Sequence, residues 1–353
     1  MNNKNLLYLN LAVDDKDVSL GFAHTWIEQF SRKFENIDII TLNKSTESMG
    51  KNNNVKIYGL AKSDNSSRLS KILKIRKIIK DLTSTTKYDL CFSHMSPLLL
   101  LMTKIYSLNR FPKILWYTHP KPKELSKRIV LILGLLLSNK VVTASKSSFP
   151  YKSSKVNVIG HAIDYELFFN KREKVLNKEF IIISRISKSK NLEVAIDGFL
   201  SSKFKNYNIS LVGDTVTEED KNYKNKLSKK YANNNNVIFL GKIPHKELPD
   251  LLKKYSYHIN ATPEGFYDKS VLEAISAGLF NFYSNEDYNK HFRTDVNSYT
   301  KFALSQKSLS EVLDSVYDQE EKNILRIIHS GQLSVSDESI QTISERVTAT
   351  VAN

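Results

Sequence analysis

The chain has 353 residues but a single cysteine, Cys91. One thiol cannot form an internal disulfide, so the chain is not a disulfide-rich scaffold, and a reducing compartment such as the cytoplasm is expected. Cys91 lies in the apolar run Asp89–Ser93. This position predicts a packing role for the thiol rather than a chemical one.

Long hydrophobic runs are also missing. The longest apolar stretch, Ile129–Leu137, has nine residues, against the ~20 that a membrane-spanning helix needs. It predicts a buried helix. A secretory signal is not expected, because the apolar run Leu6–Val13 is followed by Asp14 and Asp15 without a small-residue cleavage site.

The composition is that of a globular protein of ordinary size. Hydrophobic residues make up 41% and charged residues 25% of the chain, which excludes a disordered chain. The length suits two domains that each bury a core. We find no internal repeat of solenoid period.

Acidic residues are scarce in the first half. Residues 1–170 hold 26 Lys and Arg but 13 Asp and Glu, while the rest hold 26 and 24, so the two parts carry +13 and +2. This asymmetry indicates an anionic partner for the first half, although a lysine-rich proteome would produce it too. An amphipathic helix expected at Arg68–Lys80 and the basic segment Lys121–Arg128 could contact an anionic membrane. The helix could equally just cover a sheet, with these residues on its apolar face: Leu69, Ile72, Leu73 and Ile79.

Short apolar segments rich in β-branched residues alternate with helical patterns along the first half. This alternation predicts a doubly wound α/β domain with a buried parallel sheet. Strands are expected at 6–12, 37–42, 55–60, 89–93, 114–118, 141–144 and 156–159. Helices are expected at 25–34, 68–80, 98–108 and 124–137.

The same pattern restarts after a polar stretch at 170–178, which predicts a second α/β domain. Its strands are expected at 180–184, 209–212, 237–240, 257–260 and 281–283, and its helices at 191–199, 218–231 and 246–255. A capping box at Ser308–Glu311 predicts the start of a late helix. A last helix at 337–351 would place Ile340, Ile343 and Val347 on one face. The expected domains are therefore 1–168 and 169–335, with a C-terminal helix at 336–353 that could cross back to the first domain.

The segment Asn260–Gly278, NATPEGFYDKSVLEAISAG, carries the most functional information. It predicts a strand end, then a loop with Glu264 and Gly265, then a helix that carries Glu273. The N-terminus of that helix offers free N–H groups and the positive end of the helix dipole to an anion such as a diphosphate. Carboxylates beside it could accept hydroxyl hydrogen bonds, which points to a nucleotide sugar. An ordinary capped βα turn would have the same spacing.

This segment resembles the donor-site signature of the retaining glycosyltransferases with the GT-B fold, and of glycosyltransferase family 4, the group 1 glycosyltransferases, in particular. The matching residues are Glu264–Phe266, Glu273–Ala274 and Ser276–Gly278. One departure is visible, since eight residues separate the two glutamates where seven are usual, with Asp268–Ser270 as the insert. The resemblance implies two Rossmann-like domains facing each other across a cleft.

Three further loops match the family and extend the implied donor site. Arg185 and Lys190 follow a predicted strand and resemble the family's phosphate-binding cations, with Ser184 in place of the usual Gly. Such cations can neutralise a leaving diphosphate. The loops with Gly213 and with Ile243 resemble those near the nucleotide. The resemblance thus implies donor contacts from these residues: Arg185, Lys190, Gly213, Ile243, Gly265, Phe266 and Glu273.

In the first half, two positions resemble family site residues. Gly21, in the loop after the first strand, would permit close approach of a sugar or acceptor. His119 resembles the histidine that faces the transferred sugar, whereas His94 and His161 are weaker candidates. The implied catalytic residues are His119, Glu264, Arg185 and Lys190.

The resemblance implies a metal-independent, retaining transfer from a UDP- or GDP-linked sugar, without a cofactor, to a glycan or lipid-linked acceptor in bacterial surface polysaccharide or glycolipid assembly. A cytoplasmic enzyme with peripheral contact to the inner face of the plasma membrane is expected. Two alternatives remain, a catalytically silent GT-B scaffold subunit and a basic nucleic-acid-binding protein. No recognised nucleic-acid module supports the second, so nucleic acid is not an expected partner.

Overall fold

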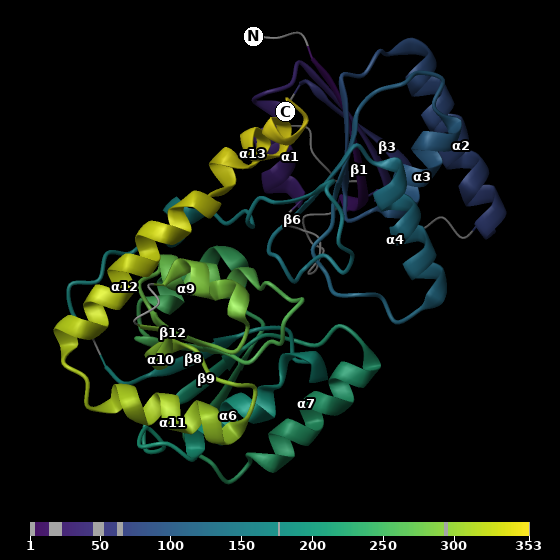
Figure 1. The fold of residues 1–353 in the computed structure, drawn as a ribbon. Helices are drawn as coiled ribbons and strands as arrows, with labels where there is room; N and C mark the ends of the chain where they lie inside the picture. The colour runs from purple at the N-terminus through teal and green to yellow at the C-terminus, as the bar shows by residue number, and fades with distance from the viewer. Residues whose placement is uncertain are drawn as a thin grey trace. The chain divides into compact units, whose positions relative to one another are not determined.

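The computed structural model describes residues 4–13, 23–44, 53–61, 66–175, 177–292 and 296–352. The chain forms two compact units (Figure 1). Unit 1 comprises residues 1–162 and 340–353, and unit 2 comprises residues 163–339. The chain therefore leaves unit 1 after Ala162 and returns to it after Ser339.

Unit 1 is built on a seven-stranded sheet in the order β3-β2-β1-β4-β5-β6-β7, with all of its strand pairs parallel. Its strands are β1 (Asn5–Val13), β2 (Asn36–Lys44), β3 (Val55–Ala61), β4 (Leu90–His94), β5 (Lys113–Trp116), β6 (Lys140–Thr143) and β7 (Val156–Val158). Its helices are α1 (Ala23–Ser31), α2 (Arg68–Thr85), α3 (Pro97–Tyr106), α4 (Leu125–Leu137) and α13 (Ile343–Ala352), with a 3₁₀ turn, η6, at Ile340–Thr342.

Unit 2 contains a five-stranded parallel sheet in the order β10-β9-β8-β11-β12. Its strands are β8 (Phe180–Ile183), β9 (Ile209–Val212), β10 (Val237–Gly241), β11 (Tyr257–Asn260) and β12 (Phe280–Tyr283). Its α-helices are α5 (Tyr165–Phe168), α6 (Leu192–Leu200), α7 (Glu218–Lys230), α8 (Leu248–Leu252), α9 (Lys269–Ser276), α10 (Asn297–Thr300), α11 (Gln306–Tyr317) and α12 (Glu321–Val335). Its 3₁₀ turns are η1 (Lys188–Lys190), η2 (His245–Glu247), η3 (Glu286–His291) and η5 (Ser336–Glu338).

Every predicted strand is present, because the predicted apolar runs are the buried parallel strands. β4, β5, β8, β9, β11 and β12 are buried along their whole length. Both sheets place their first strand in the interior and grow outward to either side, which is the Rossmann-like arrangement. The predicted doubly wound α/β architecture is confirmed.

Cys91 is fully buried in the core of unit 1, among side chains of β1, α2 and α3. Burial raises the pKa of its thiol to about 12, so the sulfur stays protonated. The predicted packing role is confirmed.

The helix predicted at Ile129–Leu137 forms, but the prediction that it is buried is wrong. Helix α4 forms, but only Leu131 and Gly134 are buried along it, while Ile129 is 50% and Leu136 is 63% exposed. The apolar face expected for α2 is also wrong in part. Ile75, Ile79 and Leu82 face the core, whereas these predicted members are exposed: Leu69, Ile72 and Leu73.

Two helices near the end of the chain differ from the predictions. Helix α11 begins at Gln306, and the hydroxyl of Ser305 caps it by accepting from the N–H of Ser308, so the capping box predicted at Ser308 is wrong by one turn. The last predicted helix is broken into two 3₁₀ turns and α13. Its predicted apolar face is buried, and α13 packs on α1. Lys33, in the turn after α1, donates to the Thr348 hydroxyl at 2.7 Å.

Within the described ranges, none of the helices combines the length and apolar character needed to cross a membrane.

Candidate active site

The strand order of unit 2 identifies the edge of the sheet where a ligand would bind. The chain runs outward from β8 to β10 on one side and from β11 to β12 on the other, so the connections diverge between β8 and β11. In open α/β sheets, ligands bind at the carboxyl ends of the strands at such a divergence. The loop after β8 carries Arg185 and Lys190, and the loop after β11 carries Glu264 and Phe266.

Lys190 and Asp268 join these two loops. The Lys190 ammonium donates to Asp268 Oδ1 at 2.6 Å and to Oδ2 at 2.8 Å. The side chains are only 11% and 18% exposed, and the ammonium also lies 5.1 Å from the centre of the Phe266 ring. The structure thus brings two predicted donor residues, Lys190 and Phe266, together, and it pairs Lys190 with Asp268, to which the sequence prediction gave no role.

Polar neighbours hold the Asp268 carboxylate in turn. Asp268 Oδ2 accepts from Asn260 Nδ2 at 3.1 Å and from the Thr262 hydroxyl at 2.7 Å. Burial acts to raise the pKa of Asp268, but the Lys190 charge and these hydrogen bonds outweigh it and lower the pKa below its ordinary value. Asp268 is therefore ionised at neutral pH.

Backbone geometry fixes the loops around this pair. Asn191 adopts a left-handed conformation at the start of α6 and donates from Nδ2 to the Ala261 carbonyl at 3.0 Å. At Gly213, with φ of 151°, a Cβ would lie 1.8 Å from the Ser184 carbonyl oxygen. Only glycine allows the loops after β8 and β9 to pass this closely. The fold therefore requires glycine at position 213 whether or not a ligand binds there.

Glu273 lies within α9 and is 5% exposed. Its Oε1 is 2.8 Å from Nε2 of His245, whose ring packs at 5.2 Å from that of Phe168. The hydrogen bond to Glu273 raises the pKa of His245, although desolvation opposes the shift. A carboxylate that already binds a half-exposed imidazole can exchange this partner for a ligand hydroxyl at little cost.

The remaining predicted residues of unit 2 differ in their exposure and backbone geometry. Arg185 and Glu264 are exposed, and neither side chain forms a hydrogen bond or ion pair with any residue that the structure describes. Gly265 has φ of 90°, in the left-handed region that favours glycine. Ile243 is half-buried against the core of unit 2.

In unit 1, His119 follows β5, is exposed, and has its ring 6.3 Å from that of Tyr117. Gly21 lies outside the described residues. His94 is buried with Nδ1 2.6 Å from the Tyr8 hydroxyl, and Nδ1 of His161 accepts from the Ala162 N–H at 3.1 Å.

Sequence reasoning missed the contacts of Asp268 and His245, and it assigned no role to Lys269. Lys269 opens α9, and desolvation lowers its pKa to about 8 although Glu273 opposes the shift. The insert Asp268–Ser270 was the available signal, because an extra residue at a helix start changes which side chains face the neighbouring loop.

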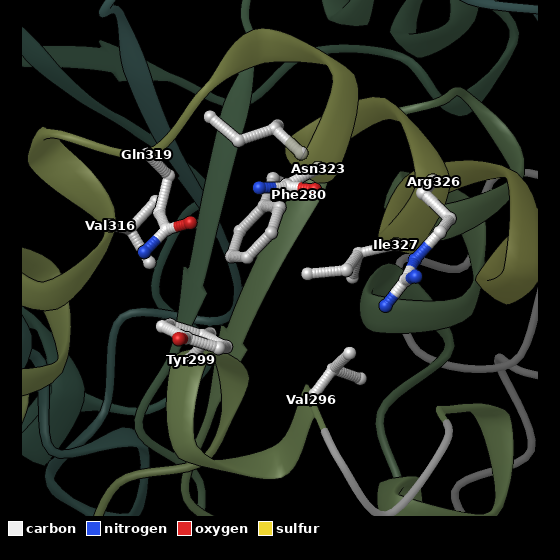
Figure 2. Close-up of a pocket in the computed structure, with 9 residues that line it drawn as sticks. Phe280, Val296, Tyr299, Val316, Gln319, Asn323, Arg326 and Ile327 are labelled. Atoms are coloured by element: carbon white, nitrogen blue, oxygen red, sulfur yellow. The ribbon is translucent and has the colours of Figure 1, made fainter.

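A separate cavity of about 160 Å³ lies elsewhere in unit 2. Figure 2 shows Phe280, Tyr299, Asn323 and Arg326 among the side chains around it. Phe280 is the first residue of β12, whereas the predicted donor residues follow the carboxyl ends of β8 to β11. None of those predicted residues lines this cavity.

Within the part of the chain that the structure describes, no three His, Cys, Asp or Glu side chains are grouped as metal ligands would be.

The fold has clear relatives among solved structures. Anabaena HepE in complex with UDP superposes with a TM-score of 0.76 at 16% identity over 99% of both chains. A glycosyltransferase of Rickettsia africae gives 0.72 at 18% identity over 99% of this chain and 98% of its own. Sucrose-phosphate synthase of Thermosynechococcus elongatus gives 0.74 at 11% identity over 99% of both chains. The chain therefore has the GT-B fold.

Residues 164–327 match the family described as glycosyl transferases group 1. This match covers nearly all of unit 2, including the loops after β8 and β11. The predicted resemblance to the group 1 glycosyltransferases is thereby confirmed. A comparison with curated proteins found no match to the chain.

Proposed function

We propose that the chain is a retaining, metal-independent glycosyltransferase that moves a sugar from a nucleoside-diphosphate sugar to a glycan or lipid-linked acceptor. The observation that carries the proposal is the meeting of Lys190 with the Phe266–Asp268 loop at the divergence between β8 and β11. The group 1 match over the same segment supports it. A role in bacterial surface polysaccharide or glycolipid assembly, in the cytoplasm, is part of the proposal.

Each predicted residue has a definite task in this proposal. Arg185 and Lys190 neutralise the diphosphate as the bond from sugar C1 to its phosphate oxygen breaks. Glu273 accepts hydrogen bonds from ribose hydroxyls, and Glu264 accepts them from the sugar. His119 and the Gly21 loop belong to the side that binds the sugar and acceptor. The acceptor oxygen bonds to C1 on the face that the phosphate leaves, and the acceptor proton passes to that phosphate.

The donor is a UDP- or GDP-linked sugar in this proposal. HepE has been crystallised with UDP and with UDP-glucose, which favours a uridine donor. Gly213 and Ile243 lie in the loops after β9 and β10, on the side of the sheet divergence where the nucleotide would extend.

The function test is incubation of the purified chain with radiolabelled UDP- and GDP-sugars in the presence of EDTA. We expect transfer or slow donor hydrolysis that persists in the chelator, because the cations of Arg185 and Lys190 take the place of a divalent ion. Activity that appears only with Mn²⁺ or Mg²⁺ would contradict the metal-independent mechanism. Donor binding without any turnover would favour the silent scaffold, and oligonucleotide binding without donor binding would favour the nucleic-acid alternative.

Contact of unit 1 with an anionic membrane is a further part of the proposal. Helix α3 packs against both α2 and α4, which places the three helices together on unit 1 (Figure 1). Beside the exposed lysines of α2 and of the segment before α4, these apolar side chains are 38–69% exposed: Leu69, Ile72, Leu73, Leu125, Ile129, Ile132 and Leu136. A basic surface that also exposes aliphatic side chains is typical of an interfacial helix.

We expect the chain to co-sediment with vesicles that contain phosphatidylglycerol, and less so at high salt, because screening shortens electrostatic reach to about 8 Å at physiological strength. Lys74→Glu with Lys77→Glu on α2 is expected to weaken binding, since each basic residue near such a surface contributes about 1 kcal/mol. The matched control is Lys226→Glu with Lys229→Glu, two exposed lysines of α7 in unit 2. Equal binding to neutral and anionic vesicles, or equal loss in both pairs, would contradict this contact.

A further inference from the structure

The Lys190 side chain is held by a carboxylate rather than left open to solvent. An ammonium has three N–H donors, and the Asp268 carboxylate accepts from it through Oδ1 at 2.6 Å and through Oδ2 at 2.8 Å, both on one side of the nitrogen. The hydrogen bonds among the described residues leave N–H groups on the other side for another acceptor. A short, charge-assisted hydrogen bond of this kind fixes the place of the ammonium.

Asp268 is itself held from several sides. Its Oδ2 accepts from Asn260 and Thr262, two residues at the carboxyl end of β11. Its backbone N–H donates to the Tyr288 hydroxyl at 2.5 Å, and that hydroxyl donates to the Asp268 carbonyl at 3.2 Å. The carboxylate therefore cannot follow a moving lysine, and Lys190 has to adopt the position that Asp268 sets.

We propose that Asp268 is a positioning residue for sugar transfer, whose carboxylate fixes Lys190 so that N–H groups on the other side of its ammonium meet the donor diphosphate. This inference rests on the function proposed above. Asp268 belongs to the insert that lengthens the usual spacing between Glu264 and Glu273, so it is a feature of this chain's own donor loop.

Two opposing consequences follow from a carboxylate at this place. Its negative charge repels a diphosphate, so its removal strengthens ground-state binding. Its loss also frees Lys190 from its position, and a misplacement of about 1 Å can cost about 10²-fold in rate. A residue that only stabilises the fold would not improve ligand binding when it is removed.

The central test is Asp268→Asn, which keeps the size of the side chain and removes its charge. We expect kcat to fall by about 10²-fold, while free UDP or GDP binds about threefold more tightly, as expected for one like charge removed at ~6 Å in water. In Lys190→Ala/Asp268→Asn, kcat should equal that of Lys190→Ala alone, because Asp268 acts through Lys190. Unchanged kcat in Asp268→Asn, or losses that add in the double variant, would overturn the proposal.

Glu219→Gln is the matched control. Glu219 pairs with Lys188 at 3.0 Å, and both side chains are largely exposed, so this variant removes one negative charge close to the same loop and should leave kcat unchanged. Thr262→Val is the replacement test variant if Asp268→Asn fails to fold. It removes one neutral hydrogen bond from the Asp268 carboxylate, and we expect a smaller fall in kcat with unchanged UDP affinity. A wild-type kcat in Thr262→Val would then overturn the proposal.

Amine acetylation of Lys190, read by mass spectrometry, separates this inference from the proposed function because it needs no donor. We expect Lys190 to react slowly in the wild type and faster in Asp268→Asn, and UDP or GDP to slow it further. Equal reactivity in wild type and Asp268→Asn overturns the positioning role. Reactivity that neither nucleotide slows overturns the proposed function instead.

Discussion

Replacing Arg185 or Lys190 by alanine is expected to lower sugar transfer by about 10²–10³-fold in each case, and Arg185→Ala is expected to leave the fold intact. A donor aimed at charge that develops in the transition state typically contributes this much. Arg185 is exposed, with no partner among the described side chains, so its removal leaves no buried group unpaired. The measurement is the initial transfer rate at saturating donor, with thermal unfolding as the check on the fold.

Lys188→Ala is the control that makes this result specific. Lys188 lies between the two cations in sequence, but it is 66% exposed and pairs with Glu219. An exposed pair of this kind contributes little to stability, and we expect near wild-type transfer from the variant. Near-normal turnover by Arg185→Ala and Lys190→Ala, or an equal loss in all three variants, would contradict the assignment of Arg185 and Lys190 to the donor diphosphate.

Glu273→Ala is expected to weaken free nucleoside diphosphate and the intact donor alike, by about tenfold or more, because a hydrogen bond to a charged group contributes about 1.5–3 kcal/mol. Glu264→Ala is expected to weaken only the intact donor, since Glu264 is assigned to the sugar. Calorimetric titration of each variant with UDP, GDP and the preferred donor measures both affinities.

The contact between Glu273 and His245 offers a control for this division of roles. His245→Ala removes the partner that Glu273 has in this structure but keeps the carboxylate. We expect it to bind nucleoside diphosphate far better than Glu273→Ala does. If His245→Ala matches the loss of Glu273→Ala, the carboxylate acts by anchoring His245 and not by binding ribose. Equal losses of both ligands in Glu264→Ala would also contradict the assignment.

The sheets were predictable because parallel strands buried on both faces appear in the sequence as short apolar runs. The segment Asn260–Gly278 resembles the group 1 family because its glycines and glutamates lie close together in sequence, and it falls within the family match. The Lys190–Asp268 pair was not, since it joins two loops 78 residues apart through a residue that departs from the family spacing. The insert Asp268–Ser270 marks this loop as unusual, but local sequence does not indicate which residue of the other loop it contacts.

The errors at the helices arise where the sequence pattern allows more than one outcome. The run Ile129–Leu137 is apolar all around, so periodicity could not distinguish a buried helix from one that exposes Ile129 and Leu136. Ser305 and Ser308 can both cap a helix, and in the structure Ser305 caps α11 while the Ser308 hydroxyl accepts from the Ala303 N–H. Sequence pattern alone does not decide between these outcomes.

Thermal unfolding of the purified chain with UDP-, GDP-, ADP- and dTDP-sugars tests the central claim, that unit 2 binds a nucleotide sugar, most directly. A ligand at ~100 times its dissociation constant adds about 2.7 kcal/mol of stability. We expect a clear rise in melting temperature with a UDP- or GDP-sugar, and a much smaller rise in Lys190→Ala at the same concentration. No rise with any of the four donors, at concentrations that stabilise a known GT-B glycosyltransferase, would contradict the account.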